Sequence, residues 1–318
     1  MKKIFVFLLI ILLLLTGCMS RPAPAQIAAT TLPVYEFTAR LCEGTPITVT
    51  RLVTEEVSCL HDYSLNVKQV KAAEAAEIIV ISGAGLEAFL DDILLDRPAV
   101  DASAGIELVV PEEHSHSHDQ EEEHGHEGHH HEQDPHIWLC PDNAMIMAQN
   151  ICHGLQETYP EHEAAFSANL ETLLADLAAL KAYGDSALQD LSCRDLITFH
   201  DGFAYLAHSF DLHILDAIEE ESGSEASAKE LIHMIEEVEH HNLPAIFTEK
   251  SGSVSAAGII SRETGAKVYA LDMAMAGDSY FDAMYHNINT LKEALQLDFL
   301  PIPVPADIPA ASGWRMYL

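Results

Sequence analysis

Short strand-like runs alternate with helical segments along most of the chain, and this alternation restricts the fold to the α/β class. Residues 77–82 (EIIVIS) form a short, continuous apolar run, which is typical of a buried strand in a parallel sheet. The predicted strands cover residues 46–53, 77–82, 100–101, 195–199, 212–218, 244–249 and 267–271. The predicted helices cover residues 66–76, 86–95, 142–155, 202–210, 227–241, 254–264 and 280–297.

One long helical segment separates the two alternating halves. Residues 162–188 carry apolar side chains at helical spacing, and a helix of this length measures about 40 Å. We therefore expect two (β/α) domains, each with a parallel-type sheet, joined by one long rigid helix. The expected ranges are a signal peptide (1–17), a tether (18–26), an N-terminal domain (27–158), the linking helix (159–190), a C-terminal domain (191–300) and a tail (301–318).

A polar insertion interrupts the N-terminal half at residues 112–133. It holds almost no apolar residue, so it cannot bury enough surface to offset the entropy of ordering, and we expect it to be disordered. Its imidazoles and carboxylates are metal ligands, but without fixed geometry they can hold ions only loosely. Its histidines are His114, His116, His118, His124, His126, His129, His130 and His131.

The N-terminus has the pattern of an exported protein. Lys2 and Lys3 precede the apolar run 4–15, which is long enough for a signal peptide and too short to span a bilayer comfortably. The following Leu-Thr-Gly-Cys18 resembles the bacterial lipobox, which implies cleavage before Cys18 and a lipid on that residue. The alternative is an ordinary signal peptide that contains a cysteine. Either way we expect the protein outside the cytoplasmic membrane, where disulfides can form.

The charge balance limits the partners. The formal net charge is −34, with 50 acidic and 16 basic residues. Nucleic-acid binding requires a basic surface, so we exclude it, and an anionic membrane would repel the body of the protein as well.

Five metal-competent side chains fall at the ends of predicted strands or in loops that follow them. His200, Glu249 and Asp272 lie at the carboxyl ends of three predicted strands, His61 follows another, and His136 follows the insertion. In open α/β sheets, ligands bind beyond the carboxyl ends of the strands, so these five residues lie where a cleft between two domains is expected. Glu249 and Asp272 could instead be helix N-caps. Six other histidines, most of them on predicted helices or their edges, are expected to have no ligand role: His208, His213, His233, His240, His241 and His286.

Several separated motifs resemble one known family. The segments are LHDYSL (60–65), DPHIWLCP (134–141), FHDGFAYLAHSFDL (199–212), IFTEKSGSVSAAGIISRETGAKVYALD (246–272) and GDSYFDAMYHNINTLKEAL (277–295). Together they resemble the zinc/manganese substrate-binding lipoproteins of bacterial ABC transporters. The resemblance implies a metal in the cleft between two domains, bound by His61, His136, His200 and Asp272. It also implies that Glu249 orients His200 through the other ring nitrogen.

The implied ligand set favours zinc. Three imidazoles and one carboxylate can complete a tetrahedral Zn²⁺ shell, whereas manganese prefers more oxygen ligands. Manganese-carrying relatives have Glu where this chain has His200. Asp278 is a weaker alternative to Asp272.

Two cysteines depart from the family pattern, Cys59 next to the His61 loop and Cys140 after His136. If both histidines bind one ion, these cysteines lie close together, and we predict a disulfide between them. The alternative is that a thiolate takes part in the metal site.

The resemblance implies a function in metal import. A monomeric, lipid-anchored protein of this kind binds Zn²⁺ and delivers it to an ABC permease and its ATPase, and the histidine-rich insertion raises the local zinc concentration. The insertion could also be a solvated loop with no such role. Alternatives for the whole protein are a zinc-binding surface adhesin or buffer, and a zinc hydrolase. The hydrolase is disfavoured because the chain lacks a His-Glu-x-x-His motif, so we expect no enzyme activity.

Overall fold

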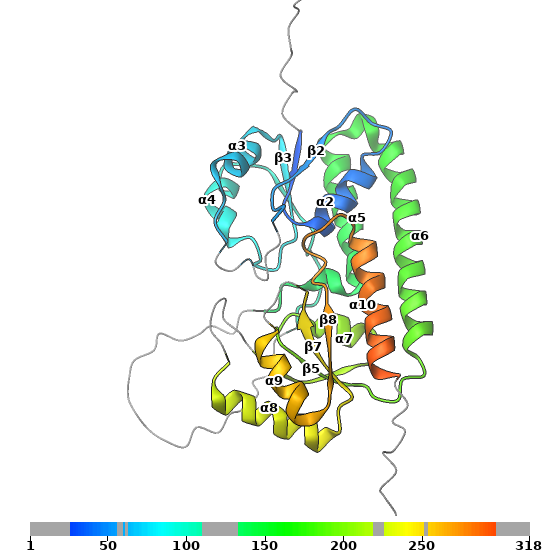
Figure 1. Ribbon diagram of the computed structural model, residues 1–318. Helices are drawn as coiled ribbons and strands as arrows, with labels where there is room; N and C mark the ends of the chain where they lie inside the picture. Colours follow the sequence, from blue (N-terminus) through cyan, green and yellow to red (C-terminus); the bar gives the residue numbers. More distant parts are fainter. Residues whose placement is uncertain are drawn as a thin grey trace, which may run out of the picture. The chain divides into compact units, whose positions relative to one another are not determined.

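The computed structural model describes residues 26–55, 60, 63–109, 133–218, 226–250 and 254–296 (Figure 1). These residues form two compact units, which we describe separately. The signal peptide, Cys18, the tether, most of the histidine-rich insertion and the tail lie outside the described residues. Within the described part of the chain, no helix has the length and apolarity needed to cross a bilayer.

The first unit is built on a parallel four-stranded sheet in the order β2-β1-β3-β4. Strand β1 is buried completely. Helix α2 contacts β1, β2 and β3, and apolar residues of α3 pack against Ala28 of β1 and Ile79 of β3. Its elements are β1 (Ile27–Ala29), α2 (Leu32–Leu41), β2 (Val49–Arg51), α3 (Val67–Ala75), β3 (Ile78–Ile81), η1 (Ala88–Leu90), α4 (Asp91–Leu94) and β4 (Ala99–Asp101). The sequence prediction omitted β1 and α2.

The predicted helix at residues 86–95 is wrong in extent. The structure has a single 3-10 turn, η1, followed by the four-residue helix α4. Gly85 in the left-handed region precedes this segment, and Pro98 follows it closely. The predicted helix fits between these two residues, and it does not form in full because Glu87 has non-helical backbone angles (φ −98°, ψ 36°) and its side chain accepts the backbone N–H groups of Ser82 and Gly83.

The second unit repeats the topology of the first, with a parallel sheet in the order β6-β5-β7-β8. Helices α8 and α9 pack with the strands around a core that includes Ile197, Met234, Ile246 and Ile260. Helix α10 contacts β8, and α9 and α10 lie on either side of the sheet (Figure 1). Its elements are β5 (Asp195–Thr198), α7 (Ala204–Ser209), β6 (His213–Ala217), α8 (Ala228–His241), β7 (Ala245–Glu249), α9 (Ser255–Thr264), β8 (Lys267–Leu271) and α10 (Tyr280–Leu295).

The long helix is confirmed as α6 (Glu163–Leu188), which has 26 residues and therefore measures about 39 Å. Its residues up to 174 belong to the first unit and those from 175 to the second, so it joins the two. In the second unit, Gly184 lies so close to the ring of Phe210 that an added Cβ would be 2.2 Å from it. The helix therefore packs tightly on this unit. The predicted α/β class with two parallel sheets and a long joining helix is confirmed.

The segment around His136 belongs to the second unit, although its position in the chain suggested the N-terminal domain. The indole of Trp138 in η2 (Ile137–Leu139) donates to the carbonyl of Met273 at 2.8 Å, and the hydroxyl of Tyr280 donates to the carbonyl of Trp138 at 2.8 Å. Trp138 and Tyr280 are fully buried. These bonds hold the segment against the end of β8, while most of the next helix, α5 (Pro141–Thr158), belongs to the first unit.

Candidate metal centre

His136 is held rigidly by Asp134. Both residues are buried, at 3% and 4% exposed, and Asp134 Oδ1 lies 2.8 Å from Nδ1 of His136. The same oxygen accepts the backbone N–H of His136 at 2.9 Å. A carboxylate on Nδ1 fixes the tautomer that presents Nε2 to a metal.

His200 has a corresponding acidic neighbour. It follows β5, and its Nδ1 lies 3.2 Å from Oε1 of Glu249, the buried last residue of β7. The rings of His136 and His200 face each other edge to face, with centroids 5.3 Å apart. The structure therefore brings two predicted ligands together, each with a carboxylate at Nδ1.

Gly202 leaves room for the His200 ring. A Cβ at this position would lie 2.5 Å from Cδ2 of His200 and 2.8 Å from the methyl group of Met273. Because Met273 also accepts the Trp138 hydrogen bond, the loops that carry His136, His200 and Asp272 are packed against one another.

Asp272 lies at the carboxyl end of β8 but is engaged by a cation. Its Oδ2 is 3.3 Å from Nζ of Lys250, and its backbone is fixed by two hydrogen bonds of 2.7 Å with the Asn287 side chain. In the described part of the chain, no three of the predicted ligands have ligating atoms within 4.8 Å of one another. A metal bound through Oδ2 of Asp272 would compete with the ammonium group of Lys250 for that oxygen.

Tyr205 of α7 bonds to two residues that flank the insertion, Val109 and Asp134. Its hydroxyl accepts the backbone N–H of Val109 at 2.9 Å and donates to the carbonyl of Asp134 at 3.1 Å. The N–H of Asp134 donates to the carbonyl of Val109 at 3.1 Å. Burial raises the pKa of Tyr205, so the hydroxyl stays protonated and can donate. The described residues on either side of the insertion, Val109 and Asp134, are thus bonded to each other and to Tyr205 close to His136.

Other predicted residues lie outside the described part of the chain: His61, Cys59 and the eight insertion histidines. Cys140 is buried, and because Cys59 lies outside the described residues, the disulfide between them stays a prediction. Asp134 was missed as an orienting residue. An Asp two residues before a His, able to accept its backbone N–H in a local turn, is the pattern that could have identified it.

Comparison with known proteins identifies the family. A family model described as the periplasmic component A of a zinc-uptake complex, ZnuA, matches residues 27–294. The chain belongs to this family. The ZnuA family assignment agrees with the resemblance seen in the sequence motifs.

Relatives and solved structures of the ZnuA type support the assignment. The zinc-binding lipoprotein AdcA of Streptococcus pneumoniae is 30% identical over 312 residues, which cover 92% of this chain and 61% of AdcA. The chain therefore spans less than two thirds of the length of that relative. A crystal structure of ZnuA matches with a TM-score of 0.71 and 28% identity, covering 85% of this chain and 99% of that one. A crystal structure of a ZnuA deletion mutant with zinc bound also matches with a TM-score of 0.71, at 27% identity. The match covers 86% of this chain and 99% of that one.

Proposed function

We propose that this protein binds Zn²⁺ outside the cytoplasmic membrane, while anchored through a lipid on Cys18, and delivers it to an ABC permease driven by an ATPase. The observation that carries the proposal is the pair of facing imidazoles, each with a carboxylate at Nδ1. Zinc-binding histidines are usually oriented in this way. The role is capture and delivery by a monomer, with no catalysis.

The proposed ligands are His136, His200, Asp272 and His61. His136 and His200 provide two imidazoles that are already oriented, and the sequence prediction supplies His61 as the third. Asp272 joins by exchanging Lys250 for the metal. Three nitrogen ligands and one oxygen ligand suit tetrahedral Zn²⁺ better than Mn²⁺.

Uptake in cells tests this function. A strain that lacks the gene should accumulate less zinc in chelator-treated medium, and the wild-type gene should restore uptake of radioactive zinc. A double variant, His136→Ala with His200→Ala, should not restore it although the protein is made in normal amounts. Full restoration by the double variant would refute the proposed site, and normal uptake in the deletion strain would refute the function.

The insertion is proposed to collect zinc for the tight site. The described residues that flank it, Val109 and Asp134, are both bonded to Tyr205 near His136, and tethering ligands near a site raises the local ion concentration. Deleting residues 112–133 should remove several weakly bound zinc ions and leave one tight ion. Titration of the mature chain, with and without the insertion, measures both classes. Loss of the tight ion on deletion would show that the insertion contains the site itself.

A further inference from the structure

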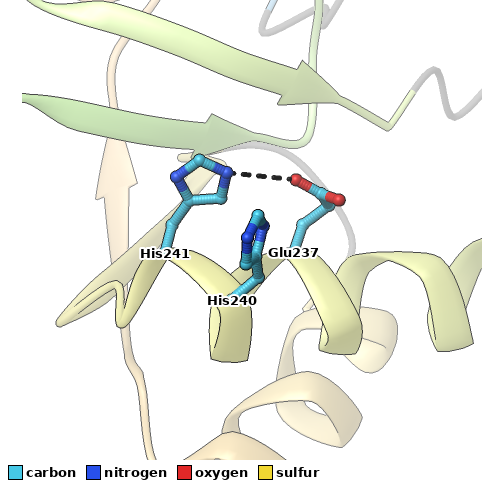
Figure 2. A group of neighbouring side chains, drawn as sticks. All are labelled: Glu237, His240 and His241. Carbon is cyan, nitrogen blue, oxygen red and sulfur yellow. Dashed lines mark ion pairs between the residues drawn. The ribbon is translucent and has the colours of Figure 1, made fainter.

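A cluster of three metal-competent side chains lies at the end of α8, outside the site described above. Glu237, His240 and His241 each offer a ligand atom, and these atoms all lie within 4.8 Å of one another. They occupy helix positions i, i+3 and i+4, which share one face. Figure 2 shows the three side chains on the last turns of α8, with the Glu237 carboxylate facing His241.

The distances fit a zinc shell. Nε2 of His241 is 3.5 Å from Oε2 of Glu237. Two ligand atoms at the usual zinc bond lengths, placed at tetrahedral angles, are about 3.3 Å apart. The ring of His240 lies with its centroid 4.7 Å from that of His241, and its ligand atom lies within 4.8 Å of the other two.

The backbone beneath the cluster is fixed. Asn242 adopts the left-handed conformation, the N–H of Leu243 donates to the carbonyl of Val238 at 3.0 Å, and Leu243 and Val238 are buried. This is a Schellman-type helix end, so the last turn is not free to fray. The helix backbone that carries the three side chains is therefore well ordered.

The electrostatic setting favours a cation. The negative end of the α8 dipole lies at this turn. Glu236 and Glu239 on the same helix are exposed and add two negative charges. Because the cluster itself is partly exposed, water can fill the remaining coordination positions of an ion.

The cluster cannot share an ion with the candidate metal centre. Helix α8 leads into the amino end of β7, whereas Glu249 marks its carboxyl end, next to His200. The five residues of β7 separate these ends by roughly 13 Å.

We propose that Glu237, His240 and His241 form a second, exchangeable binding site for Zn²⁺ or a similar borderline divalent cation. Two imidazoles and one carboxylate are the protein ligands, and water completes the shell. The site binds more weakly than the proposed transport site, because its ligands all come from one exposed helix. Unlike His136, its histidines have no described carboxylate at Nδ1 that would fix the orientation of the ring. It does not depend on the transport function.

The experiment is histidine footprinting of the mature chain with diethyl pyrocarbonate, read by mass spectrometry, with and without zinc in excess of the tight equivalent. Bound metal blocks acylation of the imidazole, so His240 and His241 should be protected. Glu237→Gln keeps the shape of the side chain but removes its charge, and it should reduce this protection. Unchanged modification of His240 and His241 in excess zinc would overturn the proposal.

His153 provides the matched control. It faces Glu157 at i+4 with 3.4 Å between Nε2 and Oε1, on an exposed helical surface, and among the described residues no third metal-competent side chain completes a group with this pair. Protection of His153 equal to that of His240 and His241 would mean non-specific binding and would also overturn the proposal.

In equilibrium dialysis, a His240→Gln/His241→Gln variant should lose one weak zinc equivalent that His153→Gln keeps, and equal stoichiometry in the two variants would contradict the site. Because these substitutions leave His136 and His200 intact, the tight equivalent should persist in both.

Discussion

Replacing His200 with alanine is expected to lower the zinc affinity of the tight site by at least about a hundredfold, or roughly 3 kcal/mol of binding free energy. The substitution removes one proposed ligand and leaves the Glu249 carboxylate buried without the imidazole it faces at 3.2 Å. Competition with a chelator of known affinity measures the change. The unfolding temperature of the metal-free variant should be recorded in parallel, because a folded variant is needed to interpret the loss.

His208→Ala is the matched control for this experiment. His208 lies on α7, eight residues from His200, and its side chain is exposed. It should change the affinity little, since surface substitutions away from a site usually have small effects. Equal affinities of the two variants would exclude His200 as a ligand.

Asp134→Asn is expected to weaken zinc binding by about 10- to 100-fold, as is typical when the partner of a metal-binding histidine is lost. Asparagine has nearly the same shape and can still accept the backbone N–H of His136. It removes the negative charge that lies 2.8 Å from Nδ1 of that ring. The tautomer of the ring becomes less well defined, so Nε2 binds the metal less strongly. Isothermal titration at fixed pH gives the affinity ratio.

Asp142→Asn separates this orienting effect from a simple loss of negative charge. Asp142 is exposed in the first turn of α5, six residues after His136. Its replacement removes the same charge without touching the buried pair, and the affinity should stay within a few fold of the wild type. A loss as large as that of Asp134→Asn would show that net charge, and not the orientation of His136, controls binding.

The sequence was sufficient to predict elements with strong local patterns. The apolar run that forms β3 and the spacing along α6 each allow one kind of secondary structure, because a continuous apolar run and a helical repeat bury different sets of side chains. The starts of two helices could also be predicted from the sequence. Asn66 and Ser227 cap α3 and α8 with reciprocal side-chain bonds to the third helical residue, a motif contained within four positions. The positions of His200 and Asp272 at strand ends followed from the same local reasoning.

Only the tertiary structure decided which side chains meet. Asp272 pairs with Lys250, and Trp138 anchors the His136 segment to Met273, 135 residues away. The sequence does not show how the side chains at the end of α8 are oriented, so His240 and His241 were expected to have no ligand role. The structure brings their ligand atoms close to the carboxylate of Glu237. Periodicity fixes which face of an element is buried, because that depends on near neighbours in the chain. Pairing between distant residues depends on how the loops pack, and local pattern contains no information about that packing.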